Sequence, residues 1–197
     1  CSIHAQPTSI SQLEVDKLSN PLGLDSENPD FSWIIKSDDF NLNQTHYQVF
    51  VAKDKVFSKN SLVWDSGKVN SSESVYIKYQ GNPLEYATKY YWAVKVWTNQ
   101  SSRPKQSKIS WWTTGLMGQK QWKSDWIGVK MEDIKGPESP YFTNDFILDG
   151  KIISANLFIT SRGVYEAYIN GKRVGKSYLT PGWTSYNNRI QYQAYDV

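Results

Sequence analysis

The sequence predicts an all-β protein of two domains, a β-sandwich followed by part of a second, jelly-roll-like β-sandwich. Three observations support this prediction. Apolar and polar residues alternate with a period of two through most of the chain, which is the pattern of half-buried strands. Aromatic residues, which pack well on pleated sheets, make up 15% of the 197 residues. No window of about 12 residues shows a convincing helical repeat.

The first domain, residues 10–114, contains seven predicted strands. They lie near 10–16, 31–36, 46–53, 62–64, 73–79, 89–98 and 107–114. The clearest alternation runs through Phe31, Trp33 and Ile35; Tyr47, Val49 and Val51; Val75, Ile77 and Tyr79; Tyr90, Trp92, Val94 and Val96. Turn-forming residues separate the runs at 20–23, 28–30, 65–67 and 81–83. Short antiparallel strands in this number, within about 100 residues, are typical of an immunoglobulin-like sandwich.

A local pattern just before the longest predicted strand narrows this fold. Leu84, Thr88 and Tyr90 have the spacing L-x-x-x-T-x-Y, which is similar to the tyrosine corner of fibronectin type III domains. In that corner the tyrosine hydroxyl bonds to the backbone a few residues upstream and fixes the strand crossing. Trp33 is expected to be the matching core tryptophan on an early strand. The alternative is that Tyr90 is simply another aromatic residue of the core.

Residues 115–125 break the alternation and are interpreted as a linker, because they are polar and contain two glycines. The second domain, residues 126–197, begins with Trp126-Ile127-Gly128. Its alternating residues are Phe142, Asn144, Phe146 and Leu148, and then Ala155, Leu157 and Ile159.

A hairpin is the strongest local signal in the second domain. The run 164–169 leads into Asn170-Gly171, and both positions of such a turn need positive φ. Residues 188–197 form a last predicted strand. About five strand candidates are fewer than a two-layered β domain usually needs. We therefore expect this domain to be truncated and the chain to be the front of a longer protein; the alternative is a small five-stranded unit that docks on the first sandwich.

The start of the chain has two interpretations, both of which imply export to the periplasm or cell surface. Cys1, the single cysteine, is similar to the lipid-bearing residue of a bacterial lipoprotein. Residues 1–5 also resemble the tail of a signal peptide that is cut near Ala5–Gln6. The alternative is that the sequence begins at Cys1 only because an arbitrary boundary was chosen there. Residues 1–9 are assigned to this export or tether segment, and no apolar stretch approaches the roughly 18 residues of a membrane span.

Composition argues against several functions. The net charge is +3 and Lys and Arg form no run of five or more, so we see no basic stripe and expect no nucleic-acid partner. One cysteine rules out a disulfide within the chain and a cysteine-based metal site. The two histidines, His4 and His46, have neither a metal-binding spacing nor a Ser/His/Asp arrangement. No glycine-rich phosphate loop is present.

Short motifs in both domains resemble a known family through their order and spacing. The second domain supplies Trp122-x-x-x-Trp126-Ile127-Gly128, Gly163-Val164-Tyr165-Glu166-Ala167-Tyr168-Ile169-Asn170-Gly171, Leu179-Thr180-Pro181-Gly182-Trp183 and Tyr192-x-x-Tyr195-Asp196-Val197. The first supplies Asn20-Pro21-Leu22-Gly23, Phe31-Ser32-Trp33, Trp64-Asp65-Ser66-Gly67 and Tyr90-x-Trp92-x-Val94. Together they resemble the N-terminal region of bacterial α-L-rhamnosidases of glycoside hydrolase family 78, over nearly the whole chain.

The resemblance implies that the active site lies in a downstream (α/α)6 helical barrel, outside this chain. The family hydrolyses terminal α-L-rhamnose with inversion, using one carboxylic acid as proton donor and one carboxylate as base for water. We therefore assign no catalytic residue and no metal ligand here. The expected partners are that barrel and a rhamnose-containing polysaccharide or glycoside. The resemblance implies no required cofactor, and it allows calcium in the second domain. A calcium ion needs about six to eight oxygen ligands, and we cannot identify such a set in the sequence.

The loop at residues 181–189 is the best candidate for carbohydrate binding. Trp183 and Tyr186 supply rings on which a sugar can stack, and Asn187 and Arg189 supply directional hydrogen bonds to hydroxyl groups. The alternative is that the two rings pack against the catalytic domain or cap the core of the sandwich.

Glu166 is a second candidate, in the strand before the hairpin. On a concave face it would orient a sugar hydroxyl, whereas on an outward face it is a solvated charge, which we favour.

Two other functions compete with the role of a non-catalytic part that supports a rhamnosidase. One is a free carbohydrate-binding module and the other is a cell-surface scaffold built from immunoglobulin-like sandwiches.

Overall fold

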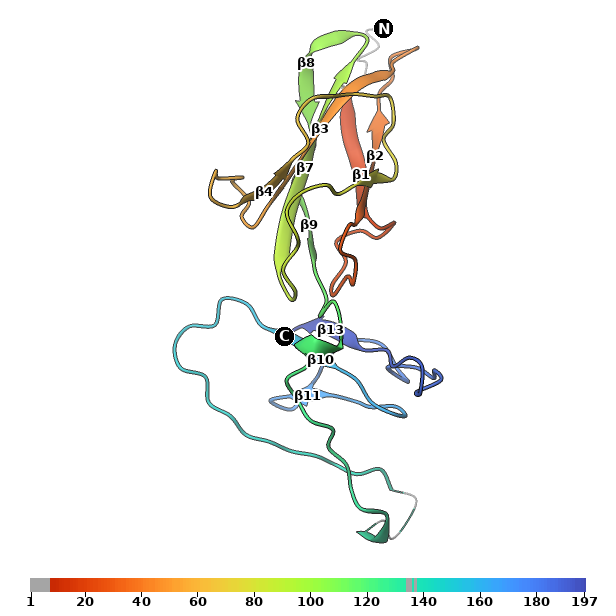
Figure 1. Cartoon of the computed structure of the whole chain (residues 1–197), viewed down its shortest axis with the longest axis vertical. Helices are drawn as coiled ribbons and strands as arrows, with labels where there is room; N and C mark the ends of the chain where they lie inside the picture. The colour runs from red at the N-terminus through yellow and green to blue at the C-terminus, as the bar shows by residue number, and fades with distance from the viewer. Residues whose placement is uncertain (1–7, 134–135, 137) are drawn as a thin grey trace, which may run out of the picture.

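The computed structural model describes residues 8–133, 136 and 138–197. It has two parts, a long β-sandwich over residues 9–113 and a smaller group of short strands over residues 156–196 (Figure 1). Strands make up nearly all the regular structure, which confirms the all-β prediction. The expectations for Cys1 lie outside the described residues, and no described helix is long and apolar enough to cross a membrane.

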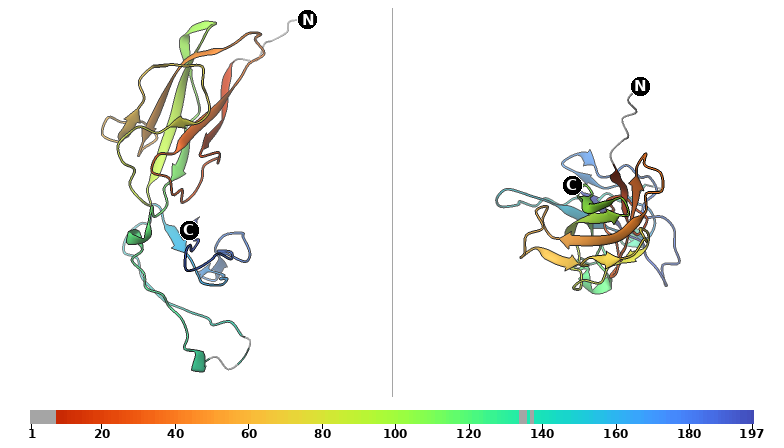
Figure 2. Two further views of the ribbon diagram at one scale, coloured as in Figure 1. Left: turned by 45° about the vertical axis from the view of Figure 1, so that its right-hand side comes forward. Right: turned by 90° about the horizontal axis from the view of Figure 1, so that it is seen from above.

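Two antiparallel sheets form the sandwich (Figure 2). The first sheet has the order β1-β2-β6 and contains β1 (Ser9–Val15), β2 (Asp30–Lys36) and β6 (Ile77–Lys78). The second has the order β4-β3-β7-β8, with β5 also paired to β3 and β9 to β7. Its strands are β3 (Gln44–Ala52), β4 (Leu62–Asp65), β5 (Val69–Asn70), β7 (Lys89–Thr98), β8 (Ser101–Gln106) and β9 (Ser110–Thr113). This arrangement confirms the predicted immunoglobulin-like sandwich.

Aromatic side chains fill the space between the two sheets. The ring of Phe31 lies 4.7 Å from that of Trp92 and 5.5 Å from that of Trp112, between centroids. Trp33 is only 1% exposed, and its Nε1 donates to Oε1 of Gln44 at 3.0 Å. Because these rings remove large apolar areas from water, they supply most of the hydrophobic stabilisation of the sandwich. Trp33 is therefore the core tryptophan that the sequence predicts.

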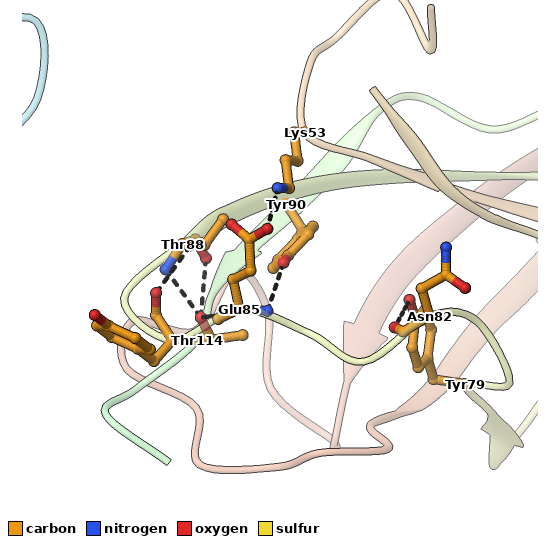
Figure 3. Close-up of polar contacts among 8 residues, drawn as sticks. Lys53, Tyr79, Asn82, Glu85, Thr88, Tyr90 and Thr114 are labelled. Atoms are coloured by element: carbon orange, nitrogen blue, oxygen red, sulfur yellow. Dashed lines mark hydrogen bonds and ion pairs between the residues drawn. The ribbon is translucent and has the colours of Figure 1, made fainter. Parts of the chain in front are cut away.

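The tyrosine corner is present, as predicted (Figure 3). The backbone N–H of Glu85 donates to the hydroxyl of Tyr90 at 2.8 Å, and Tyr90 is 1% exposed. Thr114 continues the network: its hydroxyl donates to the carbonyl of Glu85 at 2.6 Å and accepts from the N–H of Thr88 at 2.9 Å. Burial raises the pKa of Tyr90 above its usual value, because the phenolate would lose its hydration. The corner thus ties the start of β7 to the end of the sandwich.

The edge of the larger sheet departs from the prediction. β8, at residues 101–106, was not predicted, because every residue in it is exposed, all but Pro104 are polar and no apolar alternation marks it. Pro104 is tolerated there because an edge strand need not donate every N–H. The predicted strand 107–114 is shortened to β9, and the predicted strand 73–79 to β6.

The second part contains four short strands in two pairs. β10 (Asn156–Ile159) pairs with β13 (Gln193–Asp196), and β11 (Tyr168–Ile169) pairs with β12 (Lys172–Arg173). Asn170 and Gly171 form the turn of the second pair with φ of 50° and 75°. The Asn-Gly hairpin prediction is confirmed, although its strands are shorter than the sequence suggests.

Between the two parts in the sequence, the described residues from 117 to 155 form a long extended excursion that runs past the second part, away from the sandwich (Figure 1). Its only regular elements among the described residues are two short 3-10 turns, at Gln119–Gln121 and Met131–Asp133. The strand expected at 142–148 is not formed, and Ile147 is 92% exposed. That strand prediction is wrong for this structure, because alternation alone makes no strand when no neighbouring strand lies alongside to complete the backbone ladder.

Candidate functional site

The loop at residues 181–189 begins at Pro181, which is buried together with the preceding residue, Thr180. The backbone N–H of Tyr165 donates to the carbonyl of Thr180 at 2.9 Å, so the loop starts from a point fixed to the neighbouring chain segment. The peptide bond between Thr180 and Pro181 is cis. The loop therefore leaves the second part of the molecule from an anchored base.

The two predicted aromatic residues lie side by side in this loop. The ring centroids of Trp183 and Tyr186 are 5.7 Å apart, with an angle of 40° between the planes. Trp183 is 87% exposed, while Tyr186 is half-buried and its hydroxyl accepts from the N–H of Gly163 at 2.8 Å. Tyr186 thus fixes the base of the pair, and Trp183 presents most of its indole to solvent.

A turn holds the remainder of the loop in one shape. The carbonyl of Ser185 accepts from the N–H groups of Asn188 and Arg189, both at 2.8 Å. The hydroxyl of Thr184 donates to the carbonyl of Arg189 at 2.5 Å. Within the described part of the chain, the side chains of Asn187 and Arg189 are exposed and make no hydrogen bond or ion pair. These two side chains are therefore free to bond to a ligand beside the rings.

The bonding partners of Glu166 lie outside the loop at residues 181–189. Its carboxylate accepts from the hydroxyl of Tyr168 at 2.8 Å and lies 3.8 Å from the guanidinium of Arg173. The hydrogen bond to the carboxylate raises the pKa of Tyr168, because ionisation would place two negative charges together. Glu166 is exposed, so its environment is that of a solvated charge in a surface cluster, as favoured from the sequence.

Arg173 is a member of the Glu166 cluster that the sequence analysis did not single out. Its guanidinium lies 4.2 Å from the ring centroid of Tyr178 and donates to the carbonyl of Ser177 at 2.6 Å. Arg173 is the second residue after the Asn-Gly turn and pairs with Tyr168, so the hairpin register carries it near Glu166, two residues before Tyr168. That register was the one signal in the sequence from which the pair could have been found.

A half-buried pair of tyrosines, Tyr165 and Tyr195, was also missed. The hydroxyl groups of Tyr165 and Tyr195 are 3.1 Å apart, and that of Tyr165 also donates to Oε1 of Gln193 at 3.1 Å. Burial, followed by the hydrogen bond with Tyr195, raises the pKa of Tyr165. Tyr165 therefore stays neutral at ordinary pH, and its hydrogen bonds with Gln193 and Tyr195 connect the segment before the hairpin to β13.

The junction between the two parts is a compact polar contact. The hydroxyl of Tyr192 donates to Oδ1 of Asp25 at 2.7 Å and accepts from the N–H of Leu116 at 2.9 Å. The N–H of Met117 donates to the same carboxylate oxygen at 2.8 Å. Burial, together with the bond to Asp25, raises the pKa of Tyr192. The first three residues of the predicted linker, 115–117, are thus fixed between the two parts.

Metal-binding groups do not gather in the part of the chain that the structure describes: it has no cluster of three or more His, Cys, Asp or Glu side chains placed to hold an ion. The described histidine, His46, pairs through Nδ1 with the hydroxyl of Thr45 at 3.1 Å. Calcium in the second domain therefore stays a prediction, with no carboxylate cluster on which to base it.

Two protein families match this chain in succession. Residues 10–118 match the family described as "Rha78A-like, N-terminal immunoglobulin domain", and residues 150–197 match "Alpha-L-rhamnosidase N-terminal domain". Both matches fall on the parts of the structure that contain the sheets, and the excursion lies between them.

Relatives and solved structures agree with these family matches. An α-L-rhamnosidase of Formosa agariphila is 33% identical, over 95% of this chain and 23% of the relative. The solved α-L-rhamnosidase of Dictyoglumus thermophilum is 35% identical, with a TM-score of 0.83 over 95% of this chain and 23% of its own. An α-L-rhamnosidase of Streptomyces avermitilis, solved with L-rhamnose, is 29% identical with a TM-score of 0.61, over 96% and 20%. The chain thus spans less than a quarter of the length of these relatives.

Proposed function

This chain belongs to the family of Rha78A-like N-terminal immunoglobulin domains, and from that membership we propose that it is the non-catalytic N-terminal part of an α-L-rhamnosidase. The observation that carries the proposal is the succession of the two family matches, over residues 10–118 and 150–197, in a chain that covers about a fifth of its relatives. In this proposal the complete protein hydrolyses terminal α-L-rhamnose with inversion through two carboxyl groups of a helical barrel.

Exposed apolar side chains of the excursion support a role in holding that barrel. The residues of the excursion from 141 to 153 include several large side chains that are mostly exposed: Tyr141, Phe146, Ile147, Leu148, Ile152 and Ile153. A contiguous set of such side chains is costly in water, and burial against a neighbouring domain recovers about 25 cal/mol for each Å² that is covered. The proposed partner for this surface is the catalytic domain of the same polypeptide.

Hydrolysis of p-nitrophenyl α-L-rhamnoside tests the proposal directly. We expect release of p-nitrophenol by the complete product of the gene and none by residues 1–197 alone. Activity in neither protein would contradict the proposed enzyme and favour a binding or scaffold protein. Activity in residues 1–197 alone would show that the catalytic carboxyl groups lie inside this chain.

A second, narrower proposal is that the loop at residues 181–189 contacts the sugar. The observation that favours it is the 87% exposed indole of Trp183, beside Tyr186 and the free side chains of Asn187 and Arg189. Titration calorimetry of residues 1–197 with L-rhamnose, with and without a calcium chelator, tests this contact in the absence of the rhamnose site expected in the catalytic barrel. Trp183→Ala should remove the binding, whereas Trp126→Ala, which changes another exposed tryptophan, should leave it unchanged.

We also propose that the complete protein is exported to the periplasm or cell surface. Fractionation of cells that produce the complete protein checks it, and recovery of the protein only from the cytoplasm would contradict it.

A further inference from the structure

Besides Lys17 over Tyr76, four lysine side chains of the first sandwich lie over aromatic rings, and these four rings belong to the larger sheet. The ammonium-to-centroid distances are 4.0 Å for Lys89 over Trp111, 4.8 Å for Lys68 over Trp97, 4.8 Å for Lys95 over Phe50 and 5.6 Å for Lys55 over Tyr91. We name this set the lysine–aromatic row. An ammonium group at such a distance from a ring is held by cation–π attraction.

The strand pattern places the row on the outer face of the larger sheet. In β7 the residues Tyr90, Trp92, Val94 and Val96 point into the core, so Lys89, Tyr91, Lys95 and Trp97 point outward. The register brings Trp111 beside Tyr91, and Phe50 beside Ala93. From Lys89 to Trp97 the row follows eight residues of strand, about 27 Å at about 3.4 Å per residue.

The charges of the row are not neutralised by ion pairs. Within the described residues, none of the four lysines lies in an ion pair, whereas Lys53 and Lys78 elsewhere on the sandwich do. Asp65 is an acid on the same face, beside Phe50, and its Oδ1 accepts from Nε2 of Gln48 at 2.7 Å. Four ammonium groups therefore stand on this face at positions that the rings beneath them fix.

A shallow groove continues the row at the end that contains Trp97. It has a volume of about 420 Å³, and Lys68, His46, Thr45 and Ser101 contribute to its lining. Hydroxyl and imidazole groups there can bond to the hydroxyl groups of a saccharide, while Lys68 supplies a charge. The row and the groove together offer both kinds of group that a charged sugar chain requires.

We propose that the lysine–aromatic row binds an anionic polysaccharide, one whose sugar units carry carboxylate or sulfate groups. The choice of a saccharide rests on the proposed rhamnosidase function; the choice of an anion rests on the unpaired lysines. Because the rings restrict the lysine side chains before the ligand arrives, little side-chain freedom is lost on binding. Single-stranded nucleic acid fits less well, since it requires open aromatic faces for base stacking and lysines cover these rings.

Affinity electrophoresis of residues 1–197 in gels that contain a polysaccharide tests the proposal. We expect retardation by polygalacturonate, which carries carboxylates, or by dextran sulfate, and none by neutral dextran; the two anionic arms identify the group that is recognised. The variant K55Q/K68Q/K89Q/K95Q should bind at least about tenfold more weakly than the wild type at low salt, because four surface charge contacts are lost. Replacement of the same four lysines by arginine should preserve binding.

A matched control removes the same charge from other surfaces. Lys36, Lys123, Lys151 and Lys176 are exposed and lie outside the larger sheet, and their joint replacement by glutamine should leave binding unchanged. Equal loss in both quadruple variants, or no retardation of the wild-type chain by either polyanion, would overturn the proposal. Equal binding of single-stranded DNA would overturn the assignment to a saccharide. The binding measurement does not depend on hydrolysis, so its result is independent of the result of the rhamnoside assay.

Discussion

The hydroxyl of Tyr192 donates to the carboxylate of Asp25 at 2.7 Å, although the two residues are 167 positions apart in the sequence. Both groups also bond to the backbone of the connecting segment, at Leu116 and Met117. One side chain from each part therefore holds the connection between the two parts, and the direction in which the second part leaves the sandwich depends on this contact.

Removal of the Tyr192 hydroxyl should loosen the two parts. Tyr192→Phe loses the bond to a carboxylate and leaves the N–H of Leu116 without that acceptor, a cost of about 1–3 kcal/mol. We expect a broader distance distribution in small-angle X-ray scattering and a lower urea midpoint. Tyr141→Phe is the control, because Tyr141 is 83% exposed; an unchanged scattering profile for Tyr192→Phe would contradict the role given to the junction.

The tyrosine corner should contribute strongly to the stability of the sandwich. Tyr90→Phe leaves the N–H of Glu85, whose bond to Tyr90 is partly buried, without its acceptor, so the free energy of unfolding should fall by about 1–3 kcal/mol. Guanidinium unfolding of both proteins measures the difference. The same change at Tyr86, which is 47% exposed, should alter the free energy by less than about 0.5 kcal/mol.

Phe31 lies between the rings of Trp92 and Trp112 and is fully buried. Phe31→Ala should therefore lower the free energy of unfolding by about 3–5 kcal/mol, through lost burial and the cavity left between the sheets. The matched control is Phe40→Ala, because Phe40 is 91% exposed. Equal destabilisation by the two changes would show that Phe31 is not central to the core.

The excursion at residues 117–155 should be the first site of cleavage by trypsin. Lys123 and Lys151 are exposed there and lie outside any strand, whereas Lys95 is held within β7. Proteases cut segments that can be drawn into an extended form without unfolding the rest. Mass spectrometry during limited digestion should detect a stable fragment that ends near residue 120 before any cut at Lys95.

Alkaline pH should destabilise the sandwich through Tyr79. Burial raises the pKa of Tyr79 to about 12 from an ordinary value of 10.0, and its hydroxyl donates to the carbonyl of Asn82 at 2.6 Å. The folded-state pKa lies above the unfolded one, so this contribution is complete below pH 10 and is lost as the pH rises towards 12. Absorbance at alkaline pH should show Tyr79 ionising well after an exposed tyrosine, and Tyr79→Phe should flatten the fall in stability.

Local patterns were sufficient to predict much of the sandwich. Tyr90 and Trp33 were identified because a short spacing or an alternation identifies each of them, and the Asn170-Gly171 turn because its backbone geometry selects these residue types. β8 was missed because it has no apolar alternation, and hydrogen bonding to β7 forms it without that signal. The expected strand at 142–148 had the apolar signal but lacks a neighbouring strand.

Contacts between distant segments explain what the sequence could not provide about the candidate site. Trp183 and Tyr186 are three positions apart, so their pairing was within reach of a local argument. Glu166 and Arg173 meet only through the hairpin register, and Tyr192 meets Asp25 only through the fold. The lysine–aromatic row was missed for the same reason, because lysines scattered over residues 55–95 form no run in the sequence and gather only when the sheet forms.

The polar edge formed by β8 affects how the sandwich behaves at high concentration. Arg103, Pro104 and Lys105 present charges and a missing N–H where another strand would have to pair. Neighbouring copies of the sandwich, or neighbouring β domains on one polypeptide, therefore cannot extend each other's sheets along this edge. Fibres that grow by strand addition are therefore opposed at this edge of the sandwich.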